Sequence, residues 1–123
     1  MVAYPEAPWA TNWRDMTRIN SAGMGMAAES GALIDAHEAE IAQAVAAHPE
    51  VAGRSAMFIT HLDATDLSTV NFYSAADARV QFFEDLGLMT PQSVGEASDG
   101  GSFFGSVSSE RIDLFDDADV LVT

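Results

Sequence analysis

Apolar residues recur at three- and four-residue intervals across residues 12–49, a spacing that is typical of a helix with one apolar face. Thr11 or Asn12 can cap the start of this helix. Glycine destabilises a helix by about 1 kcal/mol relative to alanine, so we predict a bend or break at residues 23–25 or 30–31. The apolar face comprises Leu33, Ile34, His37, Ile41, Val45 and His48.

Two short strands and a compact helix are predicted next. Residues 55–62 and 69–73 are apolar and β-rich, and the short turn-rich segment between them predicts a hairpin. A buried stripe then recurs at helical spacing over residues 77–87. Ser74 precedes Asp77 by three residues, which resembles a capping box for this helix.

The last third of the chain predicts a loop, an aromatic turn, a helix and a strand. Residues 88–101 are rich in Pro, Ser and Gly, as expected of a surface loop. Residues 102–106 place two phenylalanines before a glycine, which predicts a tight turn with one ring exposed. Ser108 is the expected N-cap of a helix through Phe115. The apolar run 120–122 predicts a parallel strand covered on both faces, and the whole pattern predicts an α/β fold.

Length and composition fit one small domain. The chain has 123 residues, of which 48% are hydrophobic, enough to bury a core. No stretch approaches the roughly 18 consecutive apolar residues of a membrane span, and residues 1–20 lack the apolar run of a signal peptide. The absence of cysteine excludes disulfides and thiolate metal sites.

The charge of the chain is strongly negative. Five arginines and 19 acidic residues give a net charge of −14. Such a surface repels phosphate backbones and anionic lipid headgroups, which argues against nucleic-acid binding and against membrane binding through a basic patch. Because cations are scarce, each arginine is informative. Arg79 lies at a predicted strand-to-helix junction, where open α/β sheets bind ligands.

Several segments, taken in order, resemble the substrate-binding proteins of iron-siderophore ABC importers, whose two lobes are joined by one long helix. Residues 4–16 resemble the exit from the N-terminal lobe, residues 31–53 the end of the inter-lobe helix, and residues 48–55 the join to the C-terminal lobe. The resemblance implies a long connecting helix followed by the first half of a C-terminal Rossmann-like lobe. The implied parts are the lobe exit at residues 1–11, the inter-lobe helix at 12–49 and the partial C-terminal lobe at 54–123.

The resemblance also implies a ligand site. Residues 72–79 resemble the strand, turn and first helical turn that carry an arginine to the ferric-chelate oxygens, although Ala75, Ala76 and Asp77 replace the usual Gly-Pro-Gly type turn. In this position Arg79 would meet the ligand, since an arginine fork beside aromatic rings suits a flat, anionic chelate. The alternative is that Arg79 pairs with Glu84 or another nearby carboxylate.

Three aromatic residues complete the expected ligand site. Tyr73 precedes the same turn, and Phe104 occupies the position at which hydroxamate-binding relatives place a ring against the ligand. Phe103 is assigned to the core, because one of two adjacent phenylalanines normally enters it. Trp9 lies near the inter-lobe junction and can reach the cleft floor, with helix packing as its alternative role.

The implied function is extracytoplasmic capture of a ferric siderophore and its delivery to an ABC permease, with no cofactor and no covalent chemistry. Haem or a corrinoid is the alternative ligand, and a structural or regulatory interaction module is the alternative if the chain is a complete gene product. We interpret the chain as a fragment, with its export signal and lipid anchor expected upstream. Uncovered sheet edges and the apolar helix face at Leu33, Ile41 and Val45 then predict self-association.

Enzymatic and metal-binding interpretations find little support in the sequence. His61 and Asp63 end a predicted strand and are base and orienter candidates, but a G-x-S-x-G nucleophile motif is absent. His37 and Glu40 share a helix face at i and i+3, yet two weak ligands do not complete a metal site. We therefore predict no catalytic residues and no metal ligands.

Overall fold

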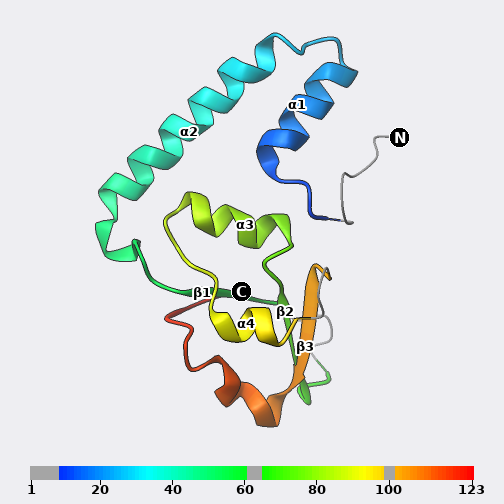
Figure 1. The fold of residues 1–123 in the computed structure, drawn as a ribbon, viewed down its shortest axis with the longest axis vertical. Helices are drawn as coiled ribbons and strands as arrows, with labels where there is room; N and C mark the ends of the chain where they lie inside the picture. The colour runs from blue at the N-terminus through cyan, green and yellow to red at the C-terminus, as the bar shows by residue number, and fades with distance from the viewer. Residues whose placement is uncertain (1–8, 61–64, 99–101) are drawn as a thin grey trace.

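The protein is a mixed α/β structure in which two helices form an arm beside a small sheet (Figure 1). A computed structural model describes residues 9–60, 65–98 and 102–123. Its elements are α1 (Trp13–Gly23), α2 (Glu29–Ala47), η1 (Pro49–Val51), β1 (Ala56–Thr60), β2 (Thr69–Tyr73), α3 (Ala78–Asp85), α4 (Gln92–Glu96), β3 (Phe104–Ser108), η2 (Ser109–Phe115) and β4 (Val120–Val122). The α/β class predicted from the sequence is confirmed.

The arm consists of two helices that contact each other. The Asn12 side chain caps α1 by accepting the Asp15 backbone N–H at 2.9 Å. The chain leaves α1 at Gly23 and passes through Gly25 with a φ of 76°, a conformation that favours glycine. The inter-lobe helix expected over residues 12–49 is thus divided into α1 and α2, and the expected break at residues 23–25 is confirmed. Gly31 lies within α2 without interrupting it.

The sheet has the strand order β3-β2-β1-β4. β1 and β2 pair antiparallel, with Ile59 opposite Phe72, so the predicted hairpin is confirmed. β4 pairs parallel to β1, with Met57 opposite Leu121. Leu121 is 59% exposed, however, so the prediction that this strand is covered on both faces is wrong for the described chain. Among the described strands, β4 is an edge strand with β1 as its one neighbour.

Two apolar clusters cover opposite faces of the sheet. Ala56 and Met57 are adjacent on β1 and project to opposite faces because successive strand residues alternate. On the side of α3 the buried residues are Ala56, Val80, Phe83 and Leu88. On the side of α4 and η2 they are Met57, Phe72, Val94 and Phe115. Tyr73, a ligand-site candidate, and Phe58 of β1 pack on the α3 cluster.

The segment from residue 88 to residue 108 differs from its prediction. The expected loop contains the helix α4, whose Val94 is buried in the core. The expected turn at residues 102–106 is wrong, because Phe104 begins the strand β3 and pairs with Tyr73 of β2. Ser108 does cap the next helix by accepting the Glu110 backbone N–H, although that helix is a 3-10 helix with a kink at Arg111.

Gly105 is required by packing and not by a turn. It lies in β3 directly opposite Phe72, whose side chain is fully buried. A β-carbon at Gly105 would lie 2.3 Å from Cζ and 2.5 Å from Cε2 of the Phe72 ring. The ring thus occupies the space that any other residue at this position needs.

We predict that Gly105→Ala destabilises the chain by about 1–3 kcal/mol, because the added methyl overpacks the core against Phe72. Urea denaturation measures the change. Gly95→Ala is the matched control: its β-carbon meets nothing within 4 Å, and its site in α4 favours alanine. Equal free energies of unfolding in the two variants would show that the Phe72 ring moves aside without loss of stability.

Two sequence expectations concern residues that the structure does not describe. The lobe-exit segment is described only from Trp9 onward, and the pair His61 and Asp63 lies outside the described residues.

Within the described part of the chain, none of the helices has the length and apolar character needed to cross a membrane.

Candidate functional site

The end of β2 brings together three of the four predicted ligand residues. Tyr73 is the last residue of β2 and lies opposite Phe104, the first residue of β3. Directly opposed strand residues project to the same face of a sheet. Arg79, in the first turn of α3, places its Cζ atom 4.1 Å from the centroid of the Tyr73 ring. This distance gives a cation–π contact.

Trp9 reaches the same corner through its backbone. Its carbonyl oxygen accepts the Ala78 N–H at 3.1 Å, at the start of α3. Its side chain is 65% exposed, so the ring lies largely in solvent. The structure thus places the Trp9 backbone beside the cluster but does not show its ring packed in it.

The turn between β2 and α3 is built by Ser74 and Asp77. Ser74 is buried; its backbone N–H donates to the Phe103 carbonyl at 3.0 Å and its hydroxyl donates to the Ser102 carbonyl. These bonds tie the turn to the entry of β3. The N-cap of α3 is Asp77, which accepts the Arg79 backbone N–H at 2.8 Å, so the predicted capping box at Ser74 is wrong. An aspartate directly before the helix was the signal for this cap.

Phe58 of β1 extends the aromatic cluster toward α3. Its ring meets the Tyr73 ring edge-on, with centroids 5.3 Å apart and an interplanar angle of 80°. It also lies nearly parallel to the Phe83 ring, at 6.1 Å and 12°. Tyr73 is therefore held from one side by Phe58 and covered by the Arg79 guanidinium.

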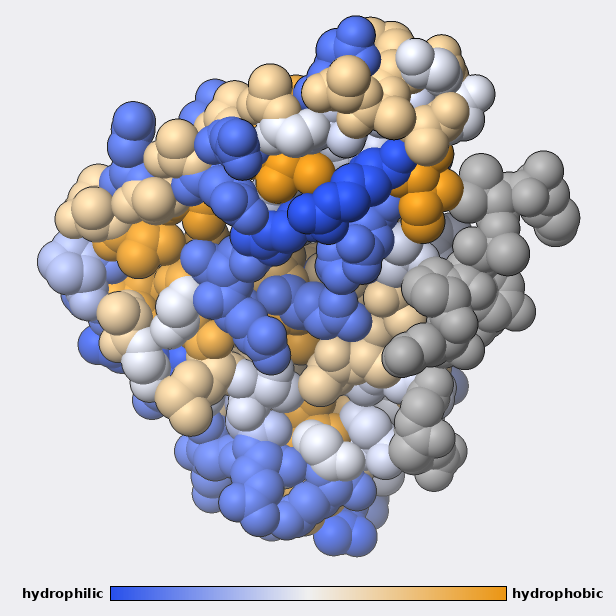
Figure 2. Space-filling view, turned by 45° about the horizontal axis from the view of Figure 1, so that its top comes forward, coloured by the Kyte–Doolittle hydropathy of each residue, from blue (hydrophilic) through white to orange (hydrophobic). Residues whose placement is uncertain are grey.

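An apolar hollow of about 370 Å³ lies beside this cluster, between α1, β1 and α3. It is lined by Thr11, Trp13, Met16, Phe58, Ala78, Arg79, Phe82 and Phe83. Arg79 is the one charged residue among these described lining residues. Sequence reasoning missed the contributions of Trp13, Phe58 and Phe82, because only the tertiary structure brings their three elements together. Figure 2 shows hydrophobic side chains exposed among hydrophilic ones on the side of the molecule where the arm meets the body.

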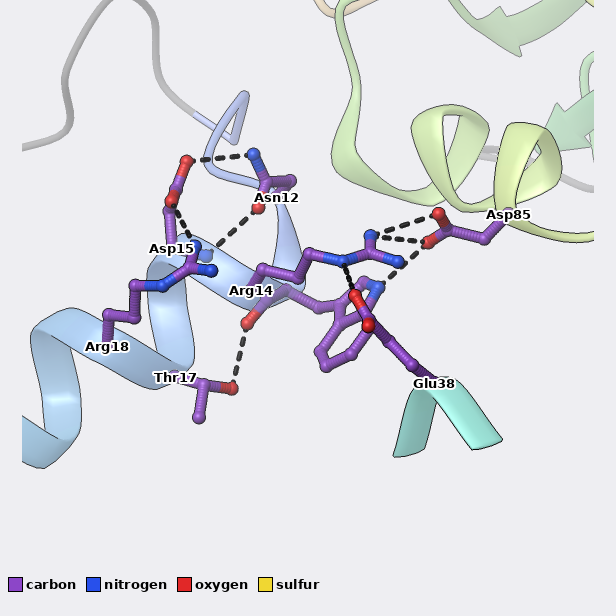
Figure 3. Close-up of polar contacts among 8 residues, drawn as sticks. Asn12, Arg14, Asp15, Thr17, Arg18, Glu38 and Asp85 are labelled. Atoms are coloured by element: carbon purple, nitrogen blue, oxygen red, sulfur yellow. Dashed lines mark hydrogen bonds and ion pairs between the residues drawn. The ribbon is translucent and has the colours of Figure 1, made fainter. Parts of the chain in front are cut away.

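Arg14 fixes the arm that supplies one wall of this hollow (Figure 3). Its Nη1 donates to both Asp85 oxygens, at 2.9 and 3.0 Å, and its Nε donates to Glu38 Oε1 at 2.6 Å. Trp13 Nε1 donates to Asp85 Oδ2 at 2.8 Å, and the Arg14 guanidinium lies 4.5 Å from the Trp13 ring centroid. One guanidinium therefore joins α1, α2 and α3. The hydrogen bond to Glu38, with that to Asp85, raises the pKa of Arg14 above its ordinary value.

A second, polar hollow of about 290 Å³ adjoins the first at Trp13, Ala78 and Phe82. Arg14 and Arg18 line it together with acidic side chains, so its charges are largely paired.

The metal-ligand candidates His37 and Glu40 lie close together in α2, with His37 Nδ1 3.4 Å from Glu40 Oε2. The described residues hold no group of three or more potential metal ligands.

The fold matches solved siderophore-binding proteins. PiaA of Streptococcus pneumoniae, in a structure complexed with ferrichrome, is 36% identical, with a TM-score of 0.83 over 97% of this chain and 40% of that chain. A second PiaA structure, described as an iron uptake ABC transporter substrate-binding protein, gives a TM-score of 0.79 at 36% identity, with the same coverage of each chain. FhuD of Vibrio cholerae, bound to Fe3+-Desferal, is 12% identical over 89% of this chain and 40% of that chain; its TM-score of 0.65 shows the fold alone.

The predicted resemblance to the substrate-binding proteins of iron-siderophore importers is thus confirmed. The chain spans about 40% of the length of the PiaA structures it matches. No family model matches the sequence, and no curated protein matches it.

We predict that Arg14→Ala destabilises the chain by about 1 kcal/mol, because it removes paired, partly exposed contacts and leaves Asp85 with the Trp13 N–H alone. Urea denaturation followed by tryptophan fluorescence measures the loss, which should shrink in high salt. Arg18→Ala is the control, since its exposed pair with Asp15 should contribute less than about 0.5 kcal/mol. Equal losses in the two variants would mean that Arg14 does not hold the arm.

Proposed function

We propose that this chain forms one wall of a ferric-siderophore site in the solute-binding component of an ABC importer. The observation that carries the proposal is the 36% identity over 97% of the chain to PiaA, whose structure holds ferrichrome. The cluster of Arg79, Tyr73 and Phe104 supports it, because the three residues lie at one corner of the sheet.

The three residues offer complementary contacts to a ferric chelate. Tyr73 and Phe104 are half-buried, so each keeps an aromatic surface for the flat chelating groups. The Arg79 side chain is 43% exposed, which leaves its guanidinium accessible to ligand oxygens. A guanidinium fork donates parallel hydrogen bonds to paired oxygens. The site binds by shape and charge, with no covalent step.

The wider role follows from the same class of protein. We propose that the whole protein is extracytoplasmic, anchored to the membrane or periplasmic, and that it delivers the chelate to an ABC permease. The similarity to the iron-uptake substrate-binding protein PiaA supports both statements. A second lobe facing the Arg79 cluster would enclose the ligand, as small-molecule sites require.

We predict that Arg79→Ala, in the full-length protein that carries this sequence, weakens binding of ferrichrome by about 1–3 kcal/mol, the scale of a charge-assisted hydrogen bond. Fluorescence titration measures the affinity, with haem and a corrinoid as competitors. Arg111→Ala is the matched control, because it makes the same charge change in η2, on the opposite face of the sheet. Unchanged affinity in Arg79→Ala would remove Arg79 from the site.

We also predict that the 123-residue chain by itself self-associates through α2. Leu33 is 49% exposed, while Ile41 and Val45 line an open hollow of about 530 Å³ under the helix. Light scattering at micromolar concentration should report a dimer or larger species, and Leu33→Glu should shift it toward monomer. Leu67→Glu is the control, since Leu67 is 69% exposed in another part of the fold. A wild-type monomer would contradict this expectation.

A further inference from the structure

Asp77 is a buried carboxylate beside the proposed site. Its side chain is 1% exposed, although it lies in the turn that leads from β2 into α3. Its Oδ1 atom accepts the Arg79 backbone N–H at 2.8 Å and so caps the helix. Capping accounts for one of the two carboxylate oxygens.

The second oxygen has no hydrogen-bond partner among the described residues. Asp77 Oδ2 is buried, and the nearest cation, Arg79 Nη1, lies 3.8 Å away. This distance permits an ion pair but exceeds the range of a hydrogen bond. A buried, unsatisfied carboxylate oxygen costs free energy, whereas asparagine or serine would cap the helix without a charge. The dipole of α3 favours a negative charge at this position, but by less than an unsatisfied buried oxygen costs, so the stability of the cap alone does not explain an aspartate here.

The position of Arg79 suggests what the negative charge of Asp77 does: it can hold the Arg79 guanidinium in place. The guanidinium approaches both the Asp77 carboxylate and the face of the Tyr73 ring: Nη1 lies 3.8 Å from Asp77 Oδ2, and Cζ lies 4.1 Å from the ring centroid. Attraction to a buried charge is weakly screened. Arg79 is thus held over the ring before a ligand arrives, and such preorganisation lowers the entropic cost of binding.

The same pair lowers the net charge of the site. The Asp77 carboxylate offsets the Arg79 cation, the one charged residue among the described residues that line the apolar hollow. It also places a negative charge at the N-terminus of α3, where the helix dipole would otherwise favour an anion. A strongly anionic chelate therefore meets little net attraction at this corner.

We propose that Asp77 is a positioning residue that holds Arg79 over Tyr73 and makes the site select ferric chelates of low net charge. This inference rests on the proposed function. Three singly charged hydroxamates neutralise ferric iron, whereas three doubly charged catecholates leave a strongly anionic complex. Asp77 thereby favours a neutral tris-hydroxamate and disfavours a tris-catecholate.

The test compares the two chelate classes in the full-length protein that carries this sequence. Asp77→Asn keeps an oxygen to cap α3 and removes the charge. We expect the ratio of affinities to shift about tenfold toward a ferric tris-catecholate, relative to ferrichrome. Asp113→Asn, the same charge change on exposed η2, should leave the ratio unchanged. If Asp77 only caps the helix, Asp77→Asn should lower the affinity for both chelates by the same factor.

The outcomes separate the two proposals. If the wild-type protein binds neither chelate, the proposed function fails. If it binds ferrichrome and Asp77→Asn shifts the ratio no more than Asp113→Asn, the function stands and the role of Asp77 is overturned. Asp77→Ser, which also retains a capping oxygen, replaces Asp77→Asn if the latter does not fold. If both variants unfold, Asp77 is a structural cap and the inference is overturned.

Discussion

The Arg14 guanidinium is the contact on which the arrangement of arm and body depends. It binds Asp85 at the end of α3 and Glu38 in the middle of α2. Trp13 donates to the same Asp85 carboxylate. Because Trp13 also lines the apolar hollow, the position of the hollow's α1 wall depends on this junction. A charge network thus sets the shape of an apolar surface.

Within the body, the register of β2 and β3 sets the proposed site. Phe72 fills the space opposite Gly105, which fixes the pairing by shape. One position further along, the same register brings Tyr73 opposite Phe104. A slip by one residue would send Tyr73 to the other face of the sheet. Packing in the core on one face therefore positions aromatic rings on the opposite face.

The two best-placed arginines show how an acidic chain uses its few cations. Arg14 has two carboxylate partners at hydrogen-bond distance, so its charge is satisfied by the structure. Among the described residues, Arg79 has one carboxylate partner, Asp77, at 3.8 Å, and its side chain remains partly exposed. The first arrangement suits a structural junction. The second leaves donors available to a ligand while limiting the net charge, which is the property that the proposed selectivity needs.

The sequence by itself determined the helical pattern of the arm, the break at its glycines and the β1–β2 hairpin, because these follow from local spacing and composition. The sequence indicated the class of protein only through the resemblance of several segments to a known family, which the match to PiaA supports. It also named Arg79, Tyr73 and Phe104, though on a resemblance and with Phe104 assigned to a turn. Local chemistry favoured that turn, since a glycine follows two phenylalanines, and only pairing with β2 made the segment a strand. The contact of Arg79 with Tyr73 and the burial of Asp77 were likewise decided by the tertiary structure. Burial and strand register depend on residues distant in the chain, which no local pattern specifies.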